Sequence, residues 1–122
     1  MALTDERYLN LATFRRTGAA VETPVWFATL DGKLYVFSAA DAGKVKRLRN
    51  SPRARVAACD LRGRLRGDWL DASARIVSDS ATIELALAAL HAKYGFQMRL
   101  ADFFSRLTGR IDRRAWLEIE LA

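Results

Sequence analysis

Short stretches of apolar and β-favouring residues, separated by turn signals, make up the first part of the chain. Residues 8–14 end at a turn signal over residues 15–18, and a second such stretch follows at residues 20–28. Asp31-Gly32 is a strong two-residue turn, and residues 34–37 follow it as a third stretch. The pattern therefore predicts a meander of three antiparallel strands.

The spacing of the apolar residues changes after the third stretch. Val45 and Leu48 share one face of a short helix, for which Ser38 or Asp41 can serve as the N-terminal cap. Pro52 stops this helix, because proline cannot continue a helical backbone. The sequence therefore predicts one short helix after the third strand.

Three further strands are predicted. Residues 53–60 resume strand character, residues 61–63 form a turn, and residues 69–77 alternate between apolar and polar side chains as a half-buried strand does. Residues 115–121 alternate in the same way, so a last strand returns to the sheet.

Two helices are predicted before that last strand. An alanine-rich helix begins at Asp79 or Ser80 and continues to about Tyr94, with Gly95 as its C-terminal stop. Residues 101–107 form the second helix. We expect three of its large apolar side chains to face the core: Phe103, Phe104 and Leu107.

The order of these elements predicts the fold class. Six short antiparallel strands expose sheet edges unless the sheet closes or pairs with another chain. We therefore expect an α+β fold built on a small six-stranded barrel with short helices. The length of 122 residues suits one core, so residues 1–122 are expected to form a single domain.

Composition excludes some classes of protein and leaves others open. The chain is 51% hydrophobic and 28% charged, and no apolar stretch reaches the roughly 20 residues that a membrane-spanning helix needs. The first residues lack the features of a secretory signal, and a single cysteine, Cys59, cannot form an internal disulfide. We therefore expect a cytoplasmic protein without a membrane partner. The net charge of +6 favours anionic partners such as nucleic acid, phosphates or polycarboxylates.

Familiar catalytic arrangements are not found in the sequence. The one histidine, His91, has no acidic neighbour within one turn of its predicted helix, so neither a metal cluster nor a nucleophilic triad is indicated. Gly63 and Gly67 lie between two predicted strands, whereas a phosphate-binding glycine loop joins a strand to a helix. We assign no catalytic side chain and no metal ligand.

A basic segment at the start of the short helix is the best candidate for a binding site. Ser38, Gly43 and Lys44 meet where unpaired backbone N–H groups favour an anion, and Arg47 follows Lys44 on the same helix face. A phosphate fits such a position. The alternative, an ordinary solvated basic face, stays open, and the carboxylate of Asp41 can itself occupy the free amides.

Several stretches together resemble the pyridoxamine 5′-phosphate oxidase-like split-barrel family, and within it the branch that uses the deazaflavin coenzyme F420. They are residues 8–16 (YLNLATFRR) with Gly18, residues 23–27 (TPVWF), residues 38–48, residues 50–53 (NSPR) and residues 93–95 (KYG). The resemblance covers nearly the whole chain and is specific as a set. Ala42 departs from it, because several relatives carry a basic residue there.

The resemblance implies an FMN-binding split β-barrel that forms a homodimer with two cofactors at the subunit interface. Thr23, Pro24, Val25 and Trp26 would then lie along the flavin or deazaflavin ring. Lys44 would bind the cofactor phosphate together with Ser38, next to Gly43 and Arg47. Trp69 is a further candidate for stacking near the ring or the substrate, and ordinary packing explains Trp26 and Trp69 equally well.

Three functions remain at this point. The first is an F420-dependent oxidoreductase that transfers hydride to or from a small conjugated or quinone-like substrate, since the carboxylates of the F420 tail suit Lys46, Arg47, Arg49 and Arg55. The second is an FMN-dependent oxidoreductase of the same group. The third is a non-catalytic barrel that binds a cofactor or single-stranded nucleic acid. We expect no nucleic-acid partner, because the aromatic residues lie in strongly apolar strands.

Overall fold

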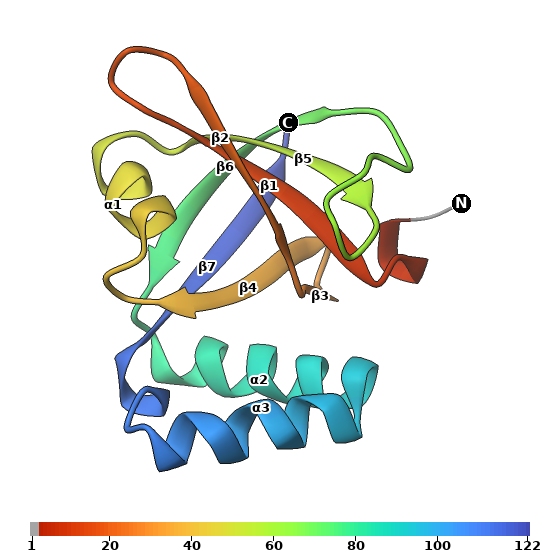
Figure 1. Ribbon diagram of the computed structural model, residues 1–122, viewed down its shortest axis with the longest axis vertical. Coiled ribbons are helices and arrows are strands. Elements are labelled where there is room, and N and C mark those ends of the chain that lie inside the picture. The colour runs from red at the N-terminus through yellow and green to blue at the C-terminus, as the bar shows by residue number, and fades with distance from the viewer. Residues whose placement is uncertain (1–2) are drawn as a thin grey trace.

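Seven antiparallel strands form one curled sheet in the computed structural model, which describes residues 3–122 (Figure 1). The strands are β1 (Tyr8–Phe14), β2 (Ala20–Val25), β3 (Ala28–Leu30), β4 (Lys33–Ala39), β5 (Arg53–Cys59), β6 (Leu70–Val77) and β7 (Arg114–Leu121). The helices are α1 (Gly43–Asn50), α2 (Ser80–Tyr94) and α3 (Phe96–Leu107), with short 3-10 turns η1 (Leu3–Asp5) and η2 (Ile111–Arg113).

The strand order gives the sheet the form of a split barrel. Neighbouring strands follow the order β2-β1-β5-β6-β7-β4-β3, so β2 and β3 are the two edges although they are consecutive in the chain. β7 lies between β6 and β4 and joins the two halves of the sheet. The predicted α+β split barrel is confirmed.

Alternation along the strands divides the apolar residues between two cores. In β4, Val36 faces the barrel interior, whereas Tyr35 faces outward toward α2. Val45 and Leu48 of α1 are buried, as their spacing predicts, and Leu48 belongs to the interior core. The outer core lies between the sheet and the helices.

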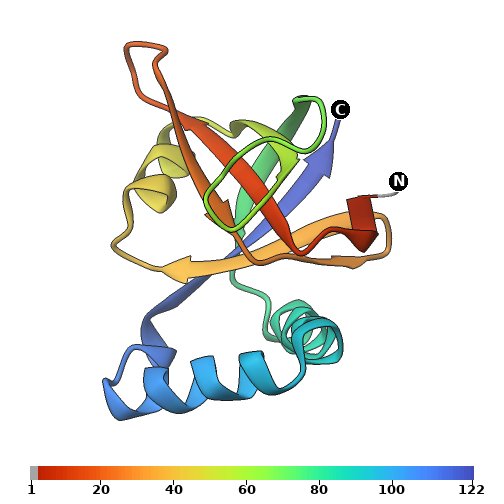
Figure 2. The same ribbon diagram turned by 45° about the vertical axis from the view of Figure 1, so that its right-hand side comes forward.

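The helical hairpin of α2 and α3 lies at one end of the barrel, and α3 is the outermost element (Figures 1 and 2). Asp79 caps α2, since its side chain accepts a hydrogen bond from the N–H of Thr82 at 2.8 Å. Gly95, with φ of 57°, joins the two helices. No helix within residues 3–122 has both the length and the apolar character needed to cross a bilayer.

The predicted second strand is two strands in the structure, which makes seven strands instead of six. β2 ends at Val25 and β3 begins at Ala28, because Trp26 and Phe27 leave the sheet ladder. The hydroxyl of Tyr94 accepts a hydrogen bond from the N–H of Phe27 at 3.0 Å, and the fully buried Phe27 ring enters the interior core. A side chain remote in sequence therefore replaces a strand partner at this break.

The prediction that Ser38 or Asp41 caps the short helix is wrong. α1 begins at Gly43, its N-cap is Ala42, and no side chain caps it. Ser38 is still part of β4, where it pairs with Ala115 of β7, and Asp41 is exposed. The sheet register therefore keeps the Ser38 hydroxyl away from the helix amides.

The prediction for the second long helix is wrong in its start and in its inward face. α3 begins at Phe96, and the side chains buried within it are Met98 and Asp102. The three residues expected to face the core are all exposed: Phe103, Phe104 and Leu107. The buried ion pair of Asp102 with Arg114, described below, favours this rotation of the helix. The strand expected to begin at residue 69 begins at Leu70.

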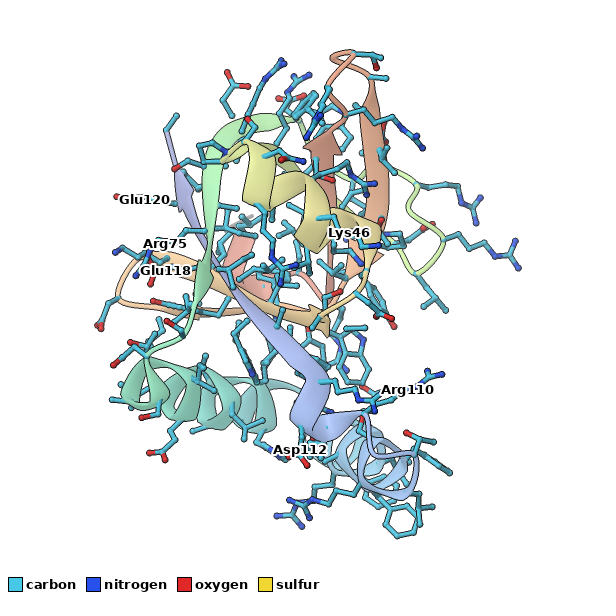
Figure 3. All side chains as sticks on the ribbon, turned by 90° about the vertical axis from the view of Figure 1, so that its left-hand side faces the viewer. Lys46, Arg75, Arg110, Asp112, Glu118 and Glu120 are labelled. Atoms are coloured by element: carbon cyan, nitrogen blue, oxygen red, sulfur yellow. The ribbon has the colours of Figure 1, made fainter. Side chains whose placement is uncertain are left out.

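A buried carboxylate on the outer face of β7 makes part of the stability dependent on pH. Glu118 accepts hydrogen bonds from Tyr35 at 2.8 Å and Arg75 at 2.9 Å, and Lys33 lies 3.4 Å away (Figure 3). Burial alone would raise the pKa of Glu118, but the hydrogen bonds and the positive charges lower it below its usual value.

We expect the Glu118 network to stabilise the fold above the ordinary carboxyl pKa and to lose that effect as the pH falls through the lowered folded-state pKa. Glu118→Gln should reduce the free energy of unfolding at neutral pH by about 1.5–3 kcal/mol. Its stability should also vary less with pH on the acid side, as measured by urea unfolding at a series of pH values. Glu120→Gln, at an exposed position of the same strand, is the control (Figure 3).

Candidate cofactor-binding site

Ser38 and Lys44 meet where β4 ends and α1 begins. The amino group of Lys44 donates a hydrogen bond to the Ser38 hydroxyl at 3.3 Å, and the lysine side chain is partly buried. No carboxylate within residues 3–122 forms an ion pair with Lys44. This geometry leaves a desolvated positive charge next to a hydroxyl, which suits an oxyanion.

Burial, followed by the nearby positive charge of Arg47, lowers the pKa of Lys44. Both effects disfavour the charged amino group in the free protein. An anion bound at this position would offset them, because it supplies the negative charge that the surrounding side chains do not.

Arg47 lies over the first turn of α1 and reaches the barrel wall. Its Nε donates to the hydroxyl of Thr13 at 2.7 Å, and Thr13 is fully buried in β1. A Cβ on Gly43 would approach the Arg47 guanidinium to 2.8 Å, so glycine leaves room for this side chain. Burial and the charge of Arg15 lower the pKa of Arg47. The sequence offered no sign that Thr13 positions this arginine.

A cavity of about 420 Å³ opens beside Ser38, between the end of β4 and the segment that leads into β7. Its lining is Phe37, Ser38, Ala39, Asp41, Ser105, Arg110, Arg113 and Arg114. The volume is within the usual range for small-molecule sites. Of its three arginines, only Arg114 forms an ion pair within residues 3–122, so the cavity is basic.

Arg114 is held in the wall of this cavity by contacts with three other side chains. It donates to Asp102 at 2.8 Å and to the Ser105 hydroxyl at 3.1 Å, and its guanidinium lies 4.3 Å from the centre of the Phe37 ring. Its side chain is 7% exposed. Arg114 was not predicted as a site residue, although the run Arg113-Arg114 before the last strand was a visible signal.

The predicted ring-contacting segment lies at an edge of the sheet. Thr23, Pro24 and Val25 pair with β1 on one side only, so the other side of this part of β2 has no strand partner among residues 3–122. Trp26 stacks on Tyr94, with ring centres 4.6 Å apart and planes inclined by 12°. Trp26 therefore packs against the end of α2.

Trp69 lies apart from the residues around Lys44. Its ring faces the guanidinium of Arg55 at 5.7 Å, and it is not among the residues that line the cavity beside Ser38. The structure thus brings Ser38, Gly43, Lys44 and Arg47 together, while no contact joins Trp69 to them within the described part of the chain.

His91 is held by a residue of the neighbouring helix. Its Nε2 lies 2.7 Å from Asp102 of α3, which also binds Arg114. Within residues 3–122, no cluster of three histidine, cysteine or acidic side chains could hold a metal ion. His91 therefore helps to hold Asp102 in place beside Arg114.

A comparison with known families identifies the family of this chain. Residues 2–122 match the family described as pyridoxamine 5′-phosphate oxidase. The chain belongs to this family. No match was found among curated proteins.

Solved structures of similar fold include proteins with different descriptions. A conserved hypothetical protein of Mycobacterium tuberculosis is 21% identical with a TM-score of 0.74, over 98% of this chain and 75% of its own. The heme storage protein HutZ of Vibrio cholerae is 17% identical with a TM-score of 0.73, over 97% and 83%. An FAD-binding protein of Mesorhizobium loti is 20% identical with a TM-score of 0.66, over 98% and 82%. At these identities the likeness shows the fold alone.

Proposed function

We propose that the protein binds a flavin-type cofactor through its phosphate at Ser38 and Lys44 and transfers hydride to or from a small conjugated or quinone-like substrate. The observation that carries this is the partly buried Lys44 amino group, which faces the Ser38 hydroxyl and has no acidic partner within residues 3–122. In such a reaction the cofactor carries the hydride, and the protein supplies position and electrostatics.

We propose F420 as the cofactor and FMN as the alternative. The F420 tail carries several carboxylates beyond the phosphate, and positive charge extends from Lys44 to Arg47 on one side and to the arginines of the adjacent cavity on the other. FMN would use only the phosphate position. Proteins of similar fold are described as FAD-binding or heme-storing, so binding and turnover need separate tests.

We also propose that the protein is a homodimer whose second copy completes the cofactor site. In the described part of the chain, the side of β2 away from β1 has no strand partner, so backbone groups of Thr23 to Trp26 are available to the polar edge of a ring. Light scattering after size-exclusion chromatography measures the oligomeric state directly.

Lys44→Ala should weaken F420 binding by about tenfold to a hundredfold, because a charge-assisted hydrogen bond to the phosphate is lost. The change should leave thermal unfolding nearly unchanged. Fluorescence titration with F420 and absorbance titration with FMN measure the two affinities.

Lys46→Ala is the matched control, since Lys46 is an exposed lysine of the same helix. Equal affinities of the Lys44 variant and the wild type would remove Lys44 from the site. Oxidation of reduced F420 by a panel of quinones then separates an enzyme from a protein that only binds the cofactor.

A further inference from the structure

Helix α3 has two faces of opposite roles. Met98 and Asp102 are buried against the rest of the protein. Five large apolar side chains are between 41% and 72% exposed, and we call them the outer stripe of α3: Phe96, Leu100, Phe103, Phe104 and Leu107. A monomeric protein rarely exposes so much contiguous apolar surface without a partner.

The spacing of the outer stripe directs it away from the protein. At about 100° per residue, its members cover an arc of about 100°, nearly opposite the arc of Met98, Asp102 and Ser105. Figure 1 shows α3 on the side of α2 that faces away from the sheet. The stripe is therefore a convex ridge, which suits a broad surface better than a peptide that needs a groove.

Positive charge flanks the outer stripe. Arg99 and Arg106, seven residues apart, follow the same side of the helix, and neither forms an ion pair within residues 3–122. The only carboxylate of α3, Asp102, is buried and bound to Arg114. The segment beyond α3 adds Arg110, Asp112 and Arg113, so the region stays basic. Figure 3 shows Arg110 and Asp112 there.

This charge pattern helps to decide which kind of partner covers the outer stripe. A second copy of α3 would offer the same positive charge and no exposed carboxylate. Another exposed apolar segment, with Leu61 and Leu65, differs because two of its three arginines, Arg64 and Arg66, are paired with Asp60 and Glu6. Free arginines beside phenylalanine and leucine are typical of helices that lie in the headgroup region of an anionic bilayer.

We propose that α3 docks the protein on the surface of an anionic lipid bilayer, with the outer stripe inserted among the lipids and Arg99 and Arg106 bound to phosphate headgroups. A helix that lies on a bilayer differs from one that crosses it, so this proposal is compatible with the lack of a spanning helix within residues 3–122. It replaces the expectation from the sequence that the protein has no membrane partner, and it does not depend on the proposed cofactor.

Co-sedimentation of the full chain with phosphatidylcholine vesicles, with and without phosphatidylglycerol, tests the proposal. The wild type should bind the anionic vesicles, and binding should weaken as salt is added. The double variant Phe103→Gln, Phe104→Gln should lower the partition coefficient about tenfold or more. Arg99→Gln with Arg106→Gln should lower it to a similar extent on anionic vesicles.

The matched control is Leu61→Gln with Leu65→Gln, which removes exposed apolar side chains from the β5–β6 loop and should leave binding unchanged. All these positions are exposed, and thermal unfolding verifies that the variants fold. Three results would overturn the proposal: a wild type that ignores anionic vesicles, a phenylalanine variant that binds as well as the wild type, or a loop variant that loses binding. Conversion of a wild-type dimer into a monomer by the phenylalanine variant would assign the ridge to a second copy instead.

Discussion

Replacing Asp102 with alanine is expected to lower the free energy of unfolding by about 3–5 kcal/mol, the largest effect among the substitutions considered for this protein. Asp102 binds Arg114 at 2.8 Å and His91 at 2.7 Å, and the side chain of Arg114 is only 7% exposed. The alanine variant leaves a buried guanidinium without a counter-charge. Urea unfolding followed by circular dichroism measures the loss.

Asp112→Ala is the control for this change, since Asp112 is an exposed acidic residue close to the end of α3 (Figure 3). The double variant Asp102→Ala, Arg114→Met should recover part of the stability, because the unpaired charge is removed together with its partner. A single alanine variant as stable as the wild type would show that the ion pair is not what fixes α3.

Tyr94→Phe is expected to lower the free energy of unfolding by about 1–3 kcal/mol although the ring is kept. The hydroxyl accepts from the N–H of Phe27 at 3.0 Å and donates to the carbonyl oxygen of Arg7 at 2.7 Å, with the carbonyl oxygen of Phe27 3.1 Å away. Burial raises the pKa of Tyr94 to about 12, so the hydroxyl remains protonated at all ordinary pH values. Without it, polar backbone groups at the β2–β3 break lose their partner.

The same substitution should also weaken cofactor binding, because the lost hydroxyl holds the backbone of Phe27, directly after the proposed ring-contacting residues Thr23 to Trp26. Tyr8→Phe is the matched control, since the Tyr8 hydroxyl makes no hydrogen bond within residues 3–122. Unchanged stability in Tyr94→Phe would mean that water replaces the hydroxyl at this break.

Local patterns were sufficient to predict most elements of the fold. The bounds of β1 agree with the prediction, and Asp79 and Gly95 delimit α2 as expected, because the signals for these elements lie within a few neighbouring residues. The break at Trp26 and Phe27 was missed because it depends on Tyr94, which lies more than sixty residues further along the chain. No window of sequence around residue 26 contains that information.

The orientation of α3 was mispredicted for a related reason. Hydrophobicity alone favours burial of Phe103, Phe104 and Leu107. In the structure these three side chains are exposed, and the neighbouring Asp102 is buried instead. The preference is reversed by Arg114, which comes from the following strand and needs a carboxylate partner. Such pairing depends on tertiary structure and has no periodic signature.

The candidate site was likewise predicted only where its residues are close together in the sequence. Ser38, Gly43, Lys44 and Arg47 lie within ten residues of one another, and their proximity followed from a strand end and a helix start. The cavity beside them needs residues from β4, α3 and η2, and Thr13 reaches Arg47 from β1. The order of strands decides these contacts, and a local pattern does not specify that order.

The central place of β7 affects how the chain folds as it is made. Among the seven strands it leaves the ribosome last, yet it lies between β6 and β4 in the finished sheet. Until it emerges, both of these strands have an unpaired side, and Arg114 is not there to meet Asp102. Until β7 has emerged, the nascent polypeptide completes neither its sheet nor its helical hairpin, and chaperones that cover open strands can bind in that interval.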